Sequence, residues 1–391
     1  MVHNEQRYMR MALKLARRGS RRNSAQPLIG AVAVSEDRPA GYGYSNAGSN
    51  QSAALAALEQ AGAKAAGSEL YTNIEPCLDA SDVEGAVSRL IAMRPSRVVI
   101  GGRLHSSDTT ESTHSRDVTD RIRSAGITVD VGVIEGECRE LNSVYYKYAE
   151  TGLPFVTVKF AASLDGQIAT ATGDSQWISG KPSLKLAHEL RRDHDAVMVG
   201  IGTVLLDDPQ LTVRLVDGPS PLRVIVDGRL RIPPSAKVLS AGDPSRTLIA
   251  TTDRANPHRM KELEDMGIPI RVLPRLPVAM WVQGPPEKRE FESETPELLP
   301  VRVDLSALLK LLGETGVGSI LVEGGAGIIT ALLASRKADR LVVAIAPKII
   351  GRGIPAVGDL RIHRLSDAIT FSSVKTRKLG KDIIFDGRFD L

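Results

Sequence analysis

The sequence is short of the features that would place it in a specialised class of proteins. Only two cysteines, Cys77 and Cys138, occur among its 391 residues, which excludes a disulfide scaffold and favours a reducing, cytoplasmic compartment. No apolar run approaches the roughly 18–20 residues that a membrane-spanning helix needs. The 50 basic and 46 acidic residues leave a net charge of only +4, which gives no indication of nucleic-acid binding.

What is present is the composition of an ordinary soluble globular protein. Hydrophobic residues make up 42% of the chain and charged residues 25%, which excludes bulk disorder. The length predicts two or three domains. Residues 7–18 are basic and poor in acids, like a transit peptide, but apolar side chains recur there at helical spacing. We therefore expect residues 5–18 to form the first helix of a domain, with its apolar face made by Tyr8, Met11, Ala12, Leu15 and Ala16.

Helical and strand patterns alternate through the first third of the chain. After the helix at 5–18, the predicted helices cover 51–65, 82–93, 116–125 and 135–149, and the predicted strands cover 29–36, 69–74, 97–101 and 127–133. Alternation of this kind predicts a mostly parallel sheet covered by helices on both faces.

A domain boundary is predicted at residues 149–154, where Gly152 and Pro154 punctuate the chain just before a new strand. We assign residues 1–149 to a first α/β domain and 150–391 to a second. In the second domain the predicted strands are 155–162, 195–200, 222–227, 246–251, 318–323, 340–347 and 382–386, and the predicted helices are 181–193, 257–266, 304–314 and 326–335. Residues 274–300 are rich in proline and mixed charge, so we expect an exposed, mobile insertion there.

The strongest local signal is a glycine-rich turn, Gly324–Gly325–Ala326–Gly327, between a predicted strand and a predicted helix. Glycines let backbone N–H groups approach an anion, and a helix N-terminus adds partial positive charge. A tight turn with no ligand is the alternative, and both interpretations stay open at this point.

Two further clusters carry side chains with unusual chemistry. Lys159 lies inside an otherwise apolar strand and is followed by Ser163–Leu164–Asp165–Gly166. A buried lysine needs a carboxylate partner or a changed charge state, although an edge-strand lysine pointing to solvent is also possible. Asp207 and Asp208 precede Pro209, which is typical of a turn or a helix cap.

From about residue 155 to the C-terminus, these clusters resemble the reductase domain of the bifunctional riboflavin-biosynthesis deaminase–reductase family. The resemblance continues in Pro221–Leu222–Arg223–Val224–Ile225–Val226–Asp227–Gly228 and Ala346–Pro347–Lys348–Ile349–Ile350–Gly351. It implies a dihydrofolate-reductase-like fold that uses NADPH.

The first third resembles the same family's cytidine-deaminase-like, three-layer domain, in Pro27–Val32, Ala47–Gly48 and Leu70–Cys77. The family pattern there is His-Ala-Glu at a helix start, then Pro-Cys, then a second Cys nine positions later. Here Ser52 and Ala54, or in a second register Gln51 and Ala53, stand in place of the His and Glu, and Ala86 stands in place of the second Cys. Only Cys77 is kept, so the resemblance implies a deaminase domain without zinc and without activity. A site rebuilt from His3, Glu5, His105, His114 or Cys138 is the less favoured alternative.

The resemblance also implies roles for individual residues of the second domain. Lys159 and Asp207 match the positions proposed for catalysis. The residues implied for NADPH are Ala161, Trp177, Thr203, Asp207, Gly228 and the loop Gly325, Ala326, Gly327, Ile328, Ile329, Thr330 and Ala331, and those implied for the substrate are Ser175, Arg191, Leu211, Arg214 and Glu323. Two of these residues have a structural alternative to ligand binding: Trp177 could be a core residue, and Arg191 could lie on a solvated helix face.

The resemblance implies reduction of 5-amino-6-(5-phosphoribosylamino)uracil to the ribitylamino compound, with a separate protein supplying deamination. The alternatives are an NADPH reductase of another pterin or pyrimidine and a pseudoenzyme that acts as a scaffold for a deaminase. We expect a phosphorylated pyrimidine substrate and a homo-oligomer, with no nucleic acid and no membrane as partner.

Overall fold

The computed structural model describes residues 2–19, 24–47, 51–103, 110–276 and 301–390. The chain divides into two compact units, Met1–Pro154 with Gly316–Gly318, and Phe155–Thr315 with Ser319–Leu391. Most of the predicted insertion, residues 277–300, lies outside the described residues, so its mobility stays a prediction. In the part of the chain that is described, no helix is long and apolar enough to cross a membrane.

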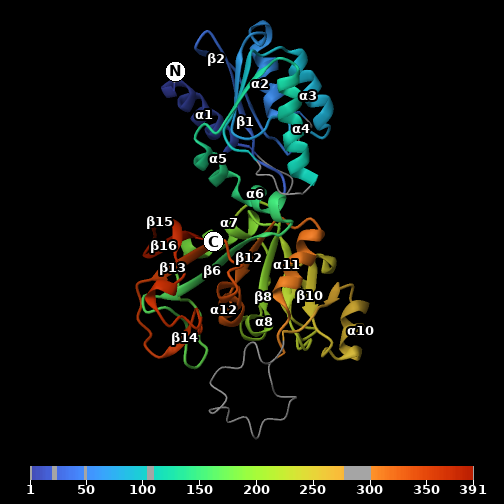
Figure 1. The fold of residues 1–391 in the computed structure, drawn as a ribbon. Coiled ribbons are helices and arrows are strands. Elements are labelled where there is room, and N and C mark those ends of the chain that lie inside the picture. The colour runs from blue at the N-terminus through green and yellow to red at the C-terminus, as the bar shows by residue number, and fades with distance from the viewer. Residues whose placement is uncertain (1, 20–23, 48–50, 104–109, 277–300, 391) are drawn as a thin grey trace. The chain divides into compact units, whose positions relative to one another are not determined.

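The amino-terminal unit is a five-stranded sheet with helices on both faces (Figure 1). Its strands are β1 (Gly30–Ser35), β2 (Arg38–Tyr44), β3 (Glu69–Thr72), β4 (Arg97–Ile100) and β5 (Thr128–Val131), in the order β2-β1-β3-β4-β5. Its helices are α1 (Val2–Ala16), α2 (Ala53–Ala61), α3 (Val83–Ala92), α4 (Thr110–Ser124), α5 (Glu135–Leu141) and α6 (Ser143–Thr151). The core on one face joins α2, α3, α4 and α6, and the core on the other face joins α1 and α5.

The predicted first helix is confirmed, but its buried face is shifted. The fully buried residues of α1 include Met9 and Leu13, whereas Met11 and Leu15 are only partly buried. The predicted helix at 135–149 is in fact two helices that meet at Asn142. The fully buried Asn142 side chain breaks the helix because it accepts a hydrogen bond from Leu28 N (2.8 Å) and donates one to Leu28 O (2.9 Å).

The prediction of a mostly parallel sheet is wrong for this unit, because β1 runs antiparallel to both β2 and β3. The sequence analysis missed β2, an edge strand that contains proline and glycine instead of an alternating apolar pattern. Two of its glycines are needed for packing: a Cβ added at Gly41 would lie 2.0 Å from Ala57 O, and one at Gly43 would lie 1.9 Å from Ala53 O. The glycines therefore let α2 approach the backbone of the edge strand.

The carboxy-terminal unit is a nine-stranded sheet in the order β11-β10-β9-β8-β12-β6-β13-β16-β15. Its strands are β6 (Phe155–Ser163), β8 (Ala196–Gly200), β9 (Leu222–Val226), β10 (Thr247–Thr251), β11 (Ile270–Val272), β12 (Ser319–Glu323), β13 (Arg340–Ala346), β15 (Phe371–Leu379) and β16 (Asp382–Phe389), with β7 (Gln167–Thr170) and β14 (Gly353–Pro355) paired separately. The helices are α7 (Lys181–Arg192), α8 (Ile201–Asp207), α9 (Lys237–Ser240), α10 (Pro257–Asp265), α11 (Leu305–Glu314) and α12 (Ala326–Ala334).

All seven strands and all four helices predicted for this unit are present. The strands from β11 to β13 run parallel, and the last two, β16 and β15, are antiparallel. In such a sheet, ligands bind beyond the carboxyl ends of the parallel strands. That edge is formed by the ends of β6, β8, β9 and β12. Predicted site residues lie on the last residues of these strands and on the segments that follow them.

Candidate functional site

The glycine-rich turn joins β12 to α12, as predicted. Gly324 and Gly325 have positive φ angles of 82° and 79°, which glycine adopts without strain. Among the described residues, no side chain caps α12, so the free N–H groups of its first turn face the end of the helix. This turn can hold an anionic group.

The predicted loop from Gly325 to Ala331 is a loop only at its first residue, because α12 begins at Ala326. Within the helix, Ile329 is fully buried. The Thr330 hydroxyl donates to Ala326 O (2.6 Å) and accepts from Gly358 N (2.8 Å). The residues of this stretch that line a cavity are Gly325, Gly327, Ile328 and Ala331.

That cavity has a volume of about 490 Å³ and lies at the carboxyl edge of the parallel strands. Gly200 and Gly202 line it from the end of β8, and Gly228 lines it from the segment after β9. Thr203 lies beside the glycine turn, since a Cβ added at Gly324 or Gly325 would be 3.4 Å from its Oγ1. The structure therefore brings Gly228 and the glycine turn together around one cavity, with Thr203 beside the turn.

Lys159 and Glu323 form the centre of an ionisable cluster. They are register partners on the parallel strands β6 and β12, and β6 lies between β12 and β13. The alternative of an edge-strand lysine is therefore wrong. Burial lowers the pKa of Lys159, the Glu323 carboxylate opposes this shift, and Arg191 adds to it. A lysine with a lowered pKa gives up its proton more readily than a free lysine.

Arg191 holds Glu323 in a buried bidentate ion pair. Its Nε and Nη2 donate to the two carboxylate oxygens at 2.5 and 2.8 Å, and its Nη1 donates to Thr212 O (3.1 Å). Both side chains are about nine-tenths buried, so the alternative of a solvated helix face is wrong. Burial alone would raise the pKa of Glu323, but Arg191 outweighs it and the pKa is lowered. A direct contact of Arg191 with substrate stays a prediction.

His188 is a site residue that the sequence analysis missed. It lies one helical turn before Arg191 on α7, it is buried, and its Nδ1 accepts from Arg214 N (3.0 Å). Burial and then Arg191 lower its pKa to about 4, so the ring is neutral at pH 7 and can accept this bond. The spacing of His188 and Arg191 on one helical face was the available signal. Together they hold the segment that carries Arg214.

Two of the other predicted substrate residues, Leu211 and Arg214, lie on this segment. Arg214 is exposed, and its Nη1 donates to Gln210 Oε1 and Thr212 Oγ1, each at 2.7 Å. The Leu211 side chain is 2% exposed. Arg214 is therefore the accessible cation of the group.

Asp207 and Ser175 are brought together at the exposed end of α8, where Ser175 Oγ donates to Asp207 Oδ1 (3.1 Å). The predicted turn is confirmed, because Asp208 has a φ of +40° and accepts from Lys237 N (2.8 Å). Trp177 is 67% exposed, so the alternative of a core tryptophan is wrong. Ala161, on β6, packs against the main core.

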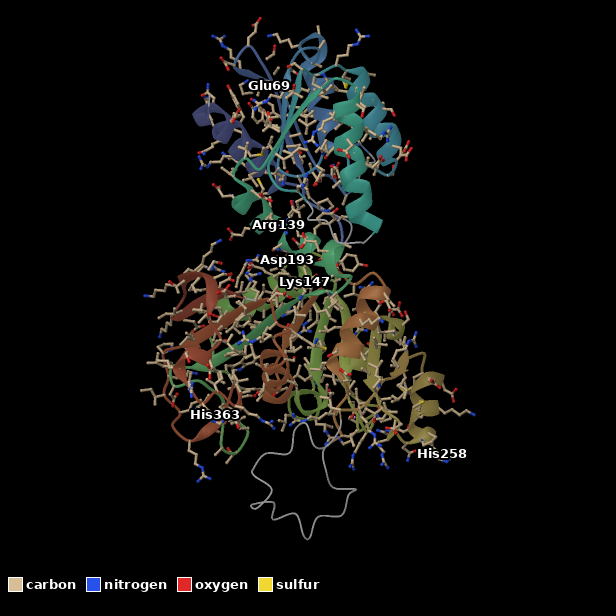
Figure 2. The ribbon with its side chains drawn as sticks, viewed as in Figure 1. Glu69, Arg139, Lys147, Asp193, His258 and His363 are labelled. Atoms are coloured by element: carbon tan, nitrogen blue, oxygen red, sulfur yellow. The ribbon has the colours of Figure 1, made fainter. Side chains whose placement is uncertain are left out.

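The histidines of this unit fall into two groups. His188 and His194 are buried. His194 contacts Leu190 O (2.6 Å) and Thr157 Oγ1 (2.9 Å), which is a structural role. His258 and His363 lie on the surface, as Figure 2 shows.

In the amino-terminal unit, the structure gathers the positions where the family pattern has its metal site. Ser52 caps α2 and is within hydrogen-bonding reach of the Cys77 thiol, which favours the register that compares Ser52 with the family's His. Ala54 and Ala86 belong to the same apolar core as Cys77. Burial raises the pKa of Cys77 to about 12, so the side chain is a neutral thiol.

The alternative donors lie elsewhere. Cys138 packs on the opposite face of the sheet from Cys77. His3 and Glu5 belong to α1, which begins three residues before the predicted start of the first helix. His105 lies outside the described residues, and so does the side chain of His114. Across the described ranges, no three His, Cys, Asp or Glu side chains are grouped as a metal site.

A carboxylate ties the start of α2 to its surroundings at this place. Asp79 Oδ2 accepts from Ala53 N and from Ser45 Oγ, each at 3.0 Å. Ser45 in turn accepts from Ile29 N (2.7 Å) through the same Oγ. The negative charge also lies at the positive end of the helix dipole. These bonds connect α2, the end of β2 and the Cys77 loop.

We expect Asp79→Ala to destabilise the amino-terminal unit by about 1–3 kcal/mol, because two buried donors lose their acceptor. Thermal unfolding measured by circular dichroism tests this. Asp79→Asn is the matched control: it keeps one acceptor oxygen and should lose less stability. An Asp79→Ala variant that melts with the parent would show that the carboxylate does not hold these segments.

Two family models match the chain. Residues 2–101 match the cytidine and deoxycytidylate deaminase zinc-binding region, and residues 154–385 match the RibD C-terminal domain. The riboflavin biosynthesis protein RibD of Aquifex aeolicus is 35% identical over 97% of this chain and 97% of its own length. RibD of Escherichia coli is 30% identical over 96% of this chain and 97% of its own.

Solved structures show the same similarity over the full length. RibD of Acinetobacter baumannii is similar with a TM-score of 0.77 and 25% identity, over 100% of both chains. A Thermotoga maritima structure, described as a diaminohydroxyphosphoribosylaminopyrimidine deaminase/5-amino-6-(5-phosphoribosylamino)uracil reductase, has a TM-score of 0.74 and 27% identity, over 100% of this chain and 99% of that one.

Proposed function

Because this chain belongs to the RibD family of riboflavin biosynthesis proteins, we propose that its carboxy-terminal unit reduces 5-amino-6-(5-phosphoribosylamino)uracil with NADPH, and that its amino-terminal unit does not deaminate. The resemblance to this family and the fold class of two α/β domains, cytidine-deaminase-like and dihydrofolate-reductase-like, are confirmed.

One observation carries the proposal for the reductase. The carboxyl edge of a parallel sheet carries both an uncapped glycine turn that borders a cavity of about 490 Å³ and an ionisable cluster around Lys159 and Glu323. The first suits a cofactor diphosphate, and the second suits proton transfer. Both are needed when a hydride and a proton are delivered to one carbon–nitrogen bond.

The residues of the cavity fit NADPH. Gly325 and Gly327, with the first turn of α12, would hold the diphosphate, and Gly228 leaves room at the opposite wall. Thr203 lies beside the glycine turn, and Trp177, with its ring exposed, would cover part of the bound molecule. When bound, NADPH supplies the hydride for C1′ of the ring-opened sugar.

The chain itself supplies proton transfer and orientation. We assign Lys159 the proton exchange that accompanies opening of the sugar ring, since it lies in register with Glu323 on the neighbouring strand and burial lowers its pKa. Asp207, which accepts a hydrogen bond from Ser175, is assigned to the same reaction from the family resemblance. Arg214 would bind the 5′-phosphate because it is an exposed cation on a segment that His188 and Arg191 hold in place.

The assay that tests this function follows NADPH oxidation with the deaminated ribosylamino-pyrimidine phosphate as substrate, beside dihydropterin and dihydrofolate substrates. We expect turnover with the pyrimidine alone. Turnover only with a pterin would favour a related reductase, and no turnover with any of them, with folded protein, would favour a scaffold.

The described residues at the family's ligand positions do not form a zinc site of the family type. A catalytic zinc needs three protein ligands, and a nearby Glu transfers protons to and from its bound water. The imidazole of the family pattern is replaced by Ser52, the carboxylate by Ala54 and the second thiolate by Ala86. The remaining thiol, that of Cys77, is buried and neutral. We derive no deamination step for this chain, so a separate deaminase would have to supply the reductase with its substrate.

We expect the purified protein to contain no stoichiometric zinc and to leave the diaminopyrimidine substrate unchanged, because only one of the three ligand positions keeps a metal-binding side chain. Elemental analysis and a chromatographic deaminase assay measure both. About one zinc per chain, together with deaminase activity that a chelator abolishes, would contradict this prediction.

A further inference from the structure

A network of hydrogen bonds lies just past the carboxyl end of β6, the strand that carries Lys159. Ser163 is the last residue of β6. In the turn that follows, the Asp165 carboxylate accepts from Ser163 Oγ (2.5 Å) through Oδ1 and from Gly351 N (2.7 Å) through Oδ2. Ile350 N also donates to this carboxylate, at 3.1 Å. Asp165 therefore ties the loop after β13 to the end of β6.

Asp165 stays ionised although its side chain is exposed. The hydrogen bond from the Ser163 hydroxyl, followed by those from the Gly351 and Ile350 N–H groups, lowers the pKa of Asp165 to about 2. Hydrogen bonds to an ionised acceptor are stronger than those between neutral groups. The tie between the two segments is therefore present throughout the neutral pH range.

Lys348 extends this network to the segment Asp174–Trp177. Its carbonyl oxygen accepts from Leu164 N (2.7 Å), in the same turn as Asp165. Its Nζ donates to Trp177 O (2.6 Å). The loop after β13 is thus fixed to the end of β6 on one side, and on the other side it holds the backbone of Trp177.

The segment Asp174–Trp177 is held at its other end by β7. Asp174 O accepts from Thr170 N (3.0 Å), and Asp174 N donates to Thr170 Oγ1 (3.1 Å). Between the two attachments, Ser175 Oγ donates to Asp207 Oδ1 (3.1 Å). The segment therefore brings a contact with one of the two assigned catalytic residues and an exposed tryptophan to the same place.

We propose that Lys348 and Asp165 are positioning residues of the reductase, because they fix the segment Asp174–Trp177 beside the bound cofactor. This inference rests on the proposed function and deepens it. Lys348 acts on the segment directly, and Asp165 acts through the loop that carries Lys348. The Trp177 side chain is 67% exposed, so burial in the core does not fix it, and an exposed segment without such bonds has a high conformational entropy.

The test compares Lys348→Met with Lys348→Arg in the full chain. Met removes the donor and keeps an unbranched side chain, whereas Arg keeps a charged donor for Trp177 O. The chain has two tryptophans, so all variants are made in a Trp281→Phe background that leaves Trp177 as the only fluorophore of its kind. Lys181→Met is the matched control, because Lys181 is an exposed lysine at the start of α7, four residues after Trp177.

We expect Lys348→Met to increase the local motion of the Trp177 ring, measured by time-resolved fluorescence anisotropy without cofactor. The affinity for NADPH, measured by calorimetry, and kcat should each fall by about 3- to 10-fold, as expected for the loss of one hydrogen bond. The Michaelis constant for the pyrimidine should change little, since it is assigned to Arg214. Lys348→Arg and Lys181→Met should match the parent, and Asp165→Ala should change the same quantities in the same direction as Lys348→Met.

Thermal unfolding of each variant separates a local change from a misfolded chain, and Asp165→Ala tests the same network from a second segment. Unchanged anisotropy in Lys348→Met, or increased motion with parental NADPH affinity and kcat, would overturn the positioning role and leave the reductase function intact. A loss of activity that Lys348→Arg does not restore would also overturn it. A parent that turns over no pyrimidine with NADPH would instead overturn the proposed function, whatever the anisotropy shows.

Discussion

Replacing Lys159 with Met should lower turnover by about 10²- to 10⁴-fold while leaving the affinity for NADPH almost unchanged. Lys159 lies on β6, an interior strand of the sheet, in register with Glu323 on the neighbouring strand β12. Burial lowers the pKa of Lys159. A group that exchanges a proton in the transition state contributes to kcat more than to ground-state binding. Met keeps the length of the side chain and removes the amine, so the fold should survive.

Steady-state kinetics with the pyrimidine substrate test this prediction, and cofactor binding is measured separately. Asp207→Asn is the companion variant, because its side chain can still accept the bond from Ser175. We expect it to lower turnover as well. Arg214→Gln is the contrasting variant and should chiefly raise the Michaelis constant for the phosphorylated substrate. If the Lys159 and Asp207 variants both turn over like the parent, the assigned catalytic pair is wrong.

The second large effect concerns the ion pair of Arg191 and Glu323. Glu323→Gln should destabilise the carboxy-terminal unit by about 3–5 kcal/mol, because it leaves a buried guanidinium without its counter-charge. The same pair holds Thr212 O through Arg191, so loss of activity should accompany loss of stability. Thermal and urea-induced unfolding measure the change.

A double variant separates stability from function at this site. Arg191→Met combined with Glu323→Leu replaces the pair by apolar side chains and should recover most of the stability, while turnover stays low because Lys159 loses its carboxylate partner. Arg192→Met is the matched control, since Arg192 pairs with Asp193 on the exposed side of the same helix, and it should change stability by no more than about 1 kcal/mol. Glu323→Gln with parental stability would show that the pair is not a structural element.

The pH dependence of this ion pair follows from the lowered pKa of Glu323. When folding lowers the pKa of a carboxyl group, the group contributes its full stabilisation at pH values above its unfolded-state pKa, which is about 4.3 for Glu. This stabilisation is lost as the pH falls through the folded-state pKa. The stability of the parent relative to the double variant should therefore be constant near neutral pH and fall under acid conditions, because only the parent carries Glu323.

The sequence by itself determined the features that depend on local pattern. Strands such as β6 and β12 are mostly apolar, and helices such as α11 carry buried leucines at helical spacing, so their positions could be predicted. The glycine turn at Gly324 and Gly325 was visible because positive φ angles require glycine. The departures from the family's deaminase pattern were also visible, since they are a matter of residue identity at Ser52, Ala54 and Ala86.

Only the tertiary structure decided the features that depend on distant partners. Arg191 and Glu323 are 132 positions apart, so no local pattern distinguishes a buried pair from a solvated arginine. Lys159 was equally compatible with an edge strand until β12 and β13 enclosed β6. The edge strands β2 and β15 were missed because they are held by backbone hydrogen bonds to a neighbour and lack an alternating apolar face. Hydrogen bonds and ion pairs between distant segments leave no periodic pattern in the sequence. These contacts bring the candidate residues together into one site, so only the tertiary structure shows which of them are neighbours.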